Sequence, residues 1–319
     1  MLVKDKSMTY IHDRCTVINF MKWDKLVLCV SGVLLIISII IIHTRGFHWG
    51  IDFTGGTVIE LHSKQPVHLD VIRVNLQQAG LMDIQVQNFD NSHDIIVYSP
   101  VKEGNQDIKL RNTIVNIINH SLQENAILKR IEFVGPRVGS ELVITGGMSI
   151  LSALLAIFLY VSVRFTWRLA LGTVLALIHD VGITLGFLAL GSIEIDLTII
   201  ASLLSVIGYS LNDKIVVSDR IRENCRKISV DSAFVITNLS ITQTFSRTII
   251  TSIITLMMVL ILFIFGGAML HGFSLTMIIG IIVGTISSIY VSSSLALKLG
   301  MQTQHMLYQE INTDIEGAP

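Results

Sequence analysis

Six stretches of the sequence are long and apolar enough to cross a lipid bilayer as helices. A helix needs about 20 apolar residues to cross a hydrocarbon core of roughly 30 Å. The runs are Leu26–Ile42, Leu142–Val163, Leu169–Leu190, Leu197–Val217, Ile249–Phe265 and Phe273–Leu297. Only 15% of the residues are charged, against about 25% in soluble domains. The sequence therefore predicts an α-helical polytopic membrane protein with six transmembrane helices.

The first run, 26–42, lies near the N-terminus, so a signal peptide is an alternative interpretation. No small-residue cleavage site follows it, and Trp23 and Trp49 flank it where interfacial anchors lie. We therefore expect it to be retained as transmembrane helix 1.

Basic residues are unevenly distributed among the segments that join the runs. The N-terminal tail, the turn after the second run and the loop after the fourth run hold them, and the other two short connections hold none. They are Lys4, Lys6, Arg14, Lys22, Lys25, Arg164, Arg168, Lys214, Arg220, Arg222, Arg226 and Lys227. The positive-inside rule places these segments in the cytoplasm. We expect cytoplasmic tails at 1–25 and 299–319, helices 2–6 within 141–298, and an external segment at 43–140.

The external segment has the patterning of a small soluble domain. Alternating and helical patterns follow one another in the order β-α-β-β-α-β. The strands are Thr57–His62, Ile84–Phe89, Asp94–Ser99 and Leu128–Val134, with a turn at Asp90–Ser92, and the helices are Leu69–Ala79 and Gln106–Glu124. This order predicts a ferredoxin-like α+β domain between transmembrane helices 1 and 2.

A glycine-rich segment, 50–56, opens this domain and contains Asp52, Gly55 and Gly56. We interpret its glycines as a tight turn between the membrane and the sheet. The domain holds no Ser/His/Asp set, no paired-carboxylate spacing and no phosphate-binding loop. The sequence therefore gives no sign of a catalytic site there.

Composition argues against several other classes of protein. The net charge is −1, so no global basic field favours nucleic acid. The cysteines, Cys15, Cys29 and Cys225, all lie outside the external domain, and no metal-ligand spacing occurs. We expect no disulfide in that domain, no metal and no cofactor.

Asp213 is the most unusual residue of the apolar runs. An ionised, unpaired carboxylate inside a bilayer costs about 3 kcal/mol or more, so we expect a partner or a function for it. Arg247, near the start of the next run, is the candidate partner. The neighbouring spans also carry polar residues on one face. These are Thr198, Ser202, Ser205, Tyr209, Asn212 and Asp219; Thr244, Arg247, Thr251 and Thr255; and Thr173, Asp180 and Thr184, with His179 beside Asp180.

Each of these residues also has a structural explanation. The hydroxyls can bond their own helix, Arg247 can extend to the membrane surface, and His179 and Asp180 can form a fixed pair. Lys214 and the charged residues after it fit a solvated cytoplasmic edge. Asp213 resists such an explanation, because Asn212 and the flexible Gly208 accompany it. Burial disfavours its charge and Arg247 favours it, so a group balanced between them can load and release protons.

Small residues four apart occur in two spans. Gly182 and Gly186 lie in the third run, and Gly280, Gly284 and Ser288 lie in the sixth. Such residues allow helix backbones to approach closely. The sequence does not decide whether they make this contact within the bundle or with a partner subunit.

Four motifs resemble those of SecF members of the SecD/SecF family, part of the resistance-nodulation-division superfamily. They are Gly50-Ile-Asp-Phe-Thr-Gly-Gly56, Val134-Gly-Pro-Arg-Val-Gly139, Ala176-Leu-Ile-His-Asp180 and Ile207-Gly-Tyr-Ser-Leu-Asn-Asp-Lys-Ile-Val-Val-Ser-Asp-Arg-Ile-Arg-Glu-Asn224. The resemblance covers nearly the whole chain. One departure is the outer turn 265–273, where Ala268 and His271 stand in place of the proline and acidic residue frequent in the family.

The resemblance implies a non-enzymatic subunit of the bacterial Sec translocase, in the cell inner membrane. It implies pairing with SecD, action beside the SecYEG channel with SecA and YajC, and coupling of proton motive force to the export of an unfolded polypeptide. The ferredoxin-like domain would be periplasmic. By motif, Asp213 matches the family's proton-relay aspartate and Arg247 its companion arginine. His179, Asp180, Tyr209 and Asn212, with the Asp52 motif, would play supporting roles.

Three alternatives remain. An exporter of lipids or small molecules of the same superfamily would need a larger external domain than 43–140. An intramembrane aspartyl protease would need Asp180 and Asp213 to share a proton. A structural scaffold for SecD would keep full export in an Asp213→Asn variant.

Overall fold

The computed structural model describes residues 17–67, 69–79, 81, 84–89, 91–99, 107–122, 126–227 and 232–301. Most of both expected cytoplasmic tails, including Cys15, lies outside the described residues, as does Asp90 of the expected turn. The described residues divide into two compact units. The helical unit lies within Met1–Phe47, Ile150–Ile193 and Thr198–Pro319, and the second unit within His48–Ser149 and Glu194–Leu197.

Six helical spans among the described residues are long and apolar enough to cross a membrane, as predicted. The first five are α1 (Asp24–Arg45), α5 (Pro136–Arg164), α6 (Trp167–Leu190), α7 (Leu197–Lys227) and α8 (Ala233–Phe265). The sixth is divided at Tyr290 into α9 (Gly267–Ile289) and α10 (Val291–Lys298). α6 contacts α1, α9 and α10 and is mostly buried, whereas α1, α5 and α8 expose many apolar side chains suited to lipid.

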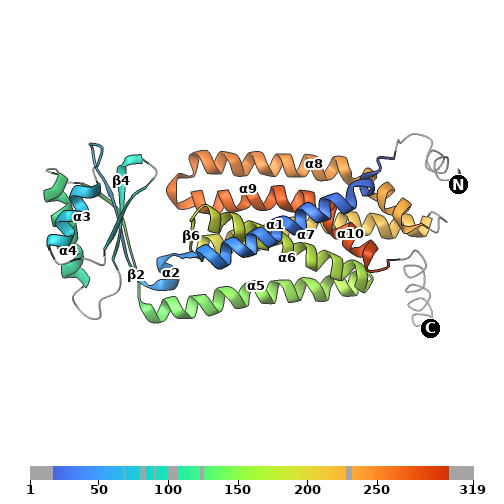
Figure 1. Ribbon diagram of the computed structural model, residues 1–319, viewed down its shortest axis with the longest axis horizontal. Helices are drawn as coiled ribbons and strands as arrows, with labels where there is room; N and C mark the ends of the chain where they lie inside the picture. Colours follow the sequence, from blue (N-terminus) through green and yellow to red (C-terminus); the bar gives the residue numbers. More distant parts are fainter. Residues whose placement is uncertain are drawn as a thin grey trace, which may run out of the picture. The chain divides into compact units, whose positions relative to one another are not determined.

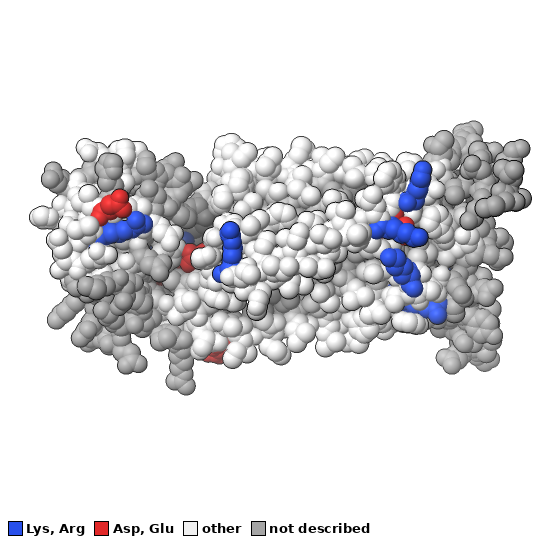
Figure 2. Space-filling view, viewed as in Figure 1, with Lys and Arg blue, Asp and Glu red and all other residues white. Residues whose placement is uncertain are grey.

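Two helices extend beyond the apolar runs from which they were predicted. α7 continues to Lys227 instead of ending at Val217, and α8 begins at Ala233 instead of Ile249. The residues added to α7 are mostly polar, and several of them, such as lysine, arginine and glutamate, are good helix formers; those added to α8 mix polar and apolar side chains. The basic residues Lys214–Lys227, predicted to follow the span in a loop, are therefore part of a helix. Figure 2 shows Lys and Arg gathered near one end of the bundle, and uncharged side chains along its middle.

The small residues predicted to allow close helix contacts do so within the chain itself. A Cβ atom added at Gly186 of α6 would lie 2.8 Å from the Ser38 backbone of α1. On α9, Gly280 and Gly284 approach side chains of α7, Val206 and Ser210. These glycines therefore serve the protein's own bundle.

The second unit contains a four-stranded antiparallel sheet with the order β3-β4-β2-β5. The strands are β2 (Gly56–His62), β3 (Gln85–Phe89), β4 (Asn91–Ser99) and β5 (Ile127–Val134), and the helices are α3 (Leu69–Gln78) and α4 (Asp107–Leu122). Both helices lie on one face of the sheet (Figure 1). Ile59 and Leu61 of β2 and Ile114 and Ile118 of α4 belong to the core between them. Strand order and connections are those of the predicted ferredoxin-like unit.

A second, two-stranded sheet was not predicted. β1 (His48–Trp49) pairs in parallel with β6 (Glu194–Ile195), which lies between α6 and α7. Each strand is only two residues long and has no periodicity to detect. This pairing brings the α6–α7 connection to the start of the ferredoxin-like unit.

We expect Gly186→Ala to destabilise the helical unit by about 1–3 kcal/mol, because the new methyl group overpacks the contact with Ser38. The loss should appear as a lower thermal denaturation midpoint of the detergent-solubilised protein. The matched control is Gly147→Ala in α5, where nothing lies within 4 Å of the added Cβ. The control should be neutral or slightly stabilising, since alanine favours helix over glycine. Equal effects of the two substitutions would contradict the close-contact role.

Candidate functional site

A fully buried ion pair joins α6 to α7. Lys214 Nζ lies 2.6 Å from Oδ2 of Asp180, and the two side chains are 0% and 1% exposed. The Ser210 hydroxyl donates to the same carboxylate oxygen at 2.7 Å and also contacts the Lys214 ammonium. A buried pair of this kind is stable only when hydrogen bonds satisfy its remaining groups. Ser210 provides such a bond.

The prediction that Lys214 belongs to a solvated cytoplasmic edge is wrong. α7 remains helical through this region, so Lys214 points into the bundle. The residues Leu203, Ile207, Ser210, Lys214 and Val217 are all buried and recur at alternating steps of four and three. This spacing, which marks one face of a helix, was present in the sequence. It went unused because Lys214 was grouped with the charged residues that follow the span.

His179 extends the network to α1. Its Nδ1 atom lies 3.1 Å from Oδ1 of Asp180, which is the contact predicted for this pair. Its Nε2 atom contacts the hydroxyl of Ser31 in α1. The sequence pattern gave no sign of Ser31, a single hydroxyl in an apolar helix. Asp180 is therefore held from α6 and α7 and, through His179, from α1.

Asp213 lies next to this network in a different environment. The residue is 3% exposed, and within the part of the chain that the structure describes no hydrogen bond reaches its buried Oδ2 atom. Lys214 and Arg247 both lie within electrostatic reach. No ion pair joins Asp213 to Arg247 directly in the described residues. A buried carboxyl oxygen without a donor is costly, so Asp213 is the unsatisfied acid of this site.

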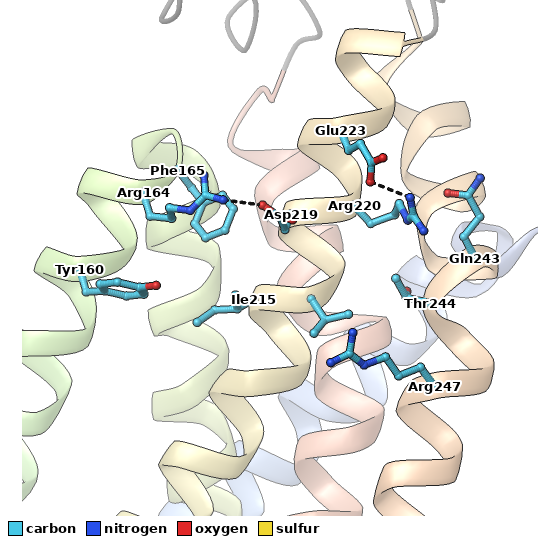
Figure 3. Close-up of a pocket in the computed structure, with 11 residues that line it drawn as sticks. Tyr160, Arg164, Phe165, Ile215, Asp219, Arg220, Glu223, Gln243, Thr244 and Arg247 are labelled. Atoms are coloured by element: carbon cyan, nitrogen blue, oxygen red, sulfur yellow. Dashed lines mark hydrogen bonds and ion pairs between the residues drawn. The ribbon is translucent and has the colours of Figure 1, made fainter. Parts of the chain in front are cut away.

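Arg247 is exposed on α8 and lines a hollow that α5 and α7 also line (Figure 3). Tyr209 donates a hydrogen bond to Ser252 of α8 at 3.1 Å, and Ser252 in turn lies 2.8 Å from Thr285 of α9. Asn212 is exposed on α7. Tyr209 thus links helices, while Asn212 lies outside the buried network.

The hydroxyl groups of the predicted polar faces mostly bond their own helices. Ser202 donates to the Ile199 carbonyl at 2.7 Å, and Thr251 donates to the Arg247 carbonyl at 2.9 Å. Ser205 and Thr255 make equivalent bonds. This is the structural alternative considered for them, so these hydroxyls do not form a polar path.

Where a tight turn was predicted, the glycine-rich motif forms the short helix α2 (Ile51–Thr54) followed by Gly55 and Gly56, and it also contacts the backbone of Leu197. Gly55 and Gly56 have φ angles of 71° and 145°, which glycine adopts readily. Asp52 Oδ2 accepts a hydrogen bond of 2.9 Å from the backbone N–H of Leu197, the first residue of α7. A carboxylate there also complements the positive end of the helix dipole. The contact joins residues 145 apart in sequence, so no local pattern could predict it.

Glu194 of β6 contacts the sheet near this motif. Tyr98 of β4 donates a hydrogen bond of 2.5 Å to Glu194 Oε2. Burial, together with the charges of Asp196 and Asp52, raises the pKa of Glu194 above its usual range, although the Tyr98 bond opposes this. Burial and the Glu194 carboxylate likewise raise the pKa of Tyr98.

The arrangement does not fit the aspartyl protease alternative. The Asp180 carboxylate bonds to Lys214, Ser210 and His179, so it does not share a proton with Asp213 as a protease dyad requires. Among the described residues, no group of three His, Cys, Asp or Glu side chains could hold a metal ion.

Sequence comparisons identify the relatives of this chain. The family described as "Protein export membrane protein SecD/SecF, C-terminal" matches residues 113–302, and "SecD/SecF GG Motif" matches residues 40–67. Relatives named "Protein translocase subunit SecF" include that of Escherichia coli O157:H7, which is 56% identical over 93% of both chains. That of Vibrio alginolyticus is 48% identical over 93% of this chain and 94% of its own.

A solved structure has the same fold. The crystal structure of SecDF from Thermus thermophilus, described as a translocon-associated membrane protein, is 35% identical, with a TM-score of 0.80. The match covers 88% of this chain but only 38% of the SecDF chain. The chain described here therefore belongs to the SecF family of protein translocase subunits.

Proposed function

We propose that this chain pairs with SecD in the bacterial inner membrane and couples proton motive force to protein export. The solved SecDF chain, of which this chain matches 38%, supports a second, SecD-like half supplied by another polypeptide. The complex would act beside the SecYEG channel, with SecA and YajC, on an unfolded polypeptide. Its role is mechanical, so it needs no enzyme activity, cofactor or nucleic acid.

The proposed topology follows the distribution of charge. The basic end of the bundle carries Arg164, Arg168, Arg220 and Arg222, and the positive-inside rule favours the cytoplasm for it. Lys214 no longer counts toward this rule because it is buried. Both termini would then be cytoplasmic, and the ferredoxin-like unit would be periplasmic, where an emerging polypeptide could contact it.

The observation that carries the proposal is the unsatisfied carboxyl group of Asp213. It is buried in a span, one of its oxygens has no donor within the described residues, and two cations lie in reach. Protonation would remove the cost of the buried charge, and approach of a cation would restore the ionised form. Asp213 is therefore the group that we assign to proton uptake and release.

The other buried charges would stay fixed during this cycle. Lys214 and Asp180 neutralise each other, and His179 and Ser210 hold the Asp180 carboxylate. Arg247 is exposed and forms no ion pair within the described residues, so its long side chain is free to approach or leave Asp213. We assign to Arg247 the role of the movable charge. The Lys214–Asp180 pair has the role of a fixed support.

An Asp213→Asn variant should lose the proton-dependent part of export, because an amide cannot exchange a proton. Export of a secretory precursor is measured in cells whose only SecF is the variant, with and without proton motive force. The ratio of the two rates should fall to unity. Asp70→Asn, at a side chain that is 96% exposed, is the matched control and should keep the normal ratio.

Assembly with SecD must be measured in the same cells by co-purification. If the Asp213→Asn variant assembles normally and keeps the full proton dependence of export, Asp213 is only a packing residue. The chain would then fit the competing function of a structural scaffold for SecD.

Lys214→Met should destabilise the protein by about 3–5 kcal/mol, because it leaves the buried Asp180 carboxylate without its counter-charge. The double variant Lys214→Met/Asp180→Asn removes both charges and should recover most of this loss. Thermal denaturation of the detergent-solubilised SecD complex compares the single and double variants. A double variant as unstable as Lys214→Met alone would show that the pair is not what supports the site.

A further inference from the structure

The connection between α6 and α7 is attached to the ferredoxin-like unit by few backbone bonds. Its strand β6 is two residues long and pairs in parallel with β1. The N–H of Gly50 donates to the Ile195 carbonyl at 2.8 Å, and the N–H of Leu197 donates to the Asp52 carboxylate at 2.9 Å. Each such bond adds only modest net stability in water. The charges of the side chains at this contact therefore influence how firmly the connection is held.

Three carboxyl groups meet at the contact. Glu194 lies in β6, Asp196 follows that strand, and Asp52 belongs to α2. A Cβ atom added at Gly50 would lie 3.3 Å from Glu194 Oε1 and 3.4 Å from Asp196 Cβ, so both side chains flank the same backbone segment. No lysine or arginine among the described residues forms an ion pair with Glu194. Since like charges this close repel one another, neutralising one of them favours the contact.

Glu194 is the member of this group whose surroundings favour the neutral form. Burial raises the pKa of Glu194 above its usual range, the hydrogen bond from Tyr98 of β4 opposes this rise, and the charges of Asp196 and Asp52 add to it. His48 of β1 acts in the opposite direction to those two charges. A protonated Glu194 can still accept the Tyr98 bond through its carbonyl oxygen. Proton binding and attachment of the connection therefore favour each other.

We infer that Glu194 is a proton-binding site that responds to the acidity of the solution around the ferredoxin-like unit and thereby controls how firmly the α6–α7 connection is attached to it. In the attached form, the Glu194 carboxylate lies against Tyr98 and takes up a proton from that solution. When the connection detaches, water surrounds the carboxyl group and the proton returns to the solution. Glu194 lies outside the membrane spans, and the inference does not depend on the relay function proposed for Asp213.

The direction of the pH dependence follows from the linkage between proton binding and attachment. A solvated glutamate, as in the detached form, has a pKa of about 4.3, whereas burial and the neighbouring carboxylates raise the pKa of Glu194 in the attached form. Attachment is therefore strongest below the ordinary value and weakens as the pH rises toward the raised one. Glu194→Gln is neutral at every pH and keeps an acceptor for Tyr98, so it should hold the connection as the protonated acid does.

Amide hydrogen exchange of the SecD-assembled chain tests this dependence. Peptides that contain Gly50 and Leu197, whose N–H groups bond across the contact, report detachment. The native protein and Glu194→Gln are compared at each pH, so the intrinsic pH dependence of exchange cancels. At about pH 8 the native protein should exchange about threefold faster or more, and the ratio should fall toward unity as the pH approaches about 4. Asp70→Asn, at a side chain that is 96% exposed in the same unit, is the matched control and should exchange as the native protein does.

Three outcomes would overturn the inference. One is a ratio that stays at unity at every pH, which would make Glu194 a fixed contact. Another is slower exchange in the native protein than in Glu194→Gln at high pH, because the ionised carboxylate would then be the form that holds the connection. The third concerns His48, whose titration also changes the charge at the contact. If the pH-dependent ratio disappears in a His48→Gln background, His48 and not Glu194 is the titrating group.

Tyr98→Phe separates the hydrogen bond from the charge. Loss of the hydroxyl should speed exchange at both peptides at every pH, since Glu194 loses its donor. The difference between high and low pH should persist, because the carboxyl group remains. Exchange in β2 and β4 should stay unchanged if only the connection detaches. None of these measurements uses export, so a failed proton-binding site at Glu194 is distinguishable from a failed relay at Asp213.

Discussion

The bonding of the candidate site depends on the buried ion pair between Lys214 and Asp180. Neither charge would be tolerated alone in a low-dielectric interior, so their 2.6 Å contact fixes α6 against α7. Ser210 and His179 complete the bonding of the carboxylate and add α1 to the same network. Close packing at Gly186 holds α1 against α6 independently of these polar bonds. Small-residue packing thus supports the α1–α6 contact, and the charge network joins α7 to the same two helices.

The contrast between the two aspartates gives the site its asymmetry. Asp180 has a full set of partners, whereas Asp213 has a buried oxygen with no donor among the described residues. The two aspartates belong to adjacent helices. A cation is bound directly to Asp180, whereas cations only lie near Asp213. A saturated carboxylate is a structural element, and an unsaturated one responds to protons and to nearby charge. Lys214, next to Asp213 in sequence, forms an ion pair with the Asp180 carboxylate but acts on Asp213 only through its nearby charge.

Much of the architecture was predictable from local patterns, because apolar run length and strand alternation are determined by residues close in sequence. The six spans and the β-α-β-β-α-β order follow from those patterns. Lys214 was misplaced because it was grouped with the charged residues that follow the span, although its spacing from Ser210 and Val217 marks a buried face. The Asp52 contact with Leu197 and the β1–β6 pair join distant segments, and no local pattern encodes them. Asp213 stood out because a carboxylate in an apolar run is costly wherever it points.

The buried ion pair also constrains how the chain enters the membrane during synthesis. A lysine at the centre of a span costs about 2.5–3.5 kcal/mol on insertion scales, so this residue disfavours insertion of α7 alone into lipid. Its counter-charge lies on the preceding helix, and only the short connection 191–196 separates the two. Release of α6 into lipid before α7 arrives would leave each helix with an unmatched charge. The α6–α7 hairpin is therefore a natural unit of membrane insertion, in which the charges of Lys214 and Asp180 are already matched.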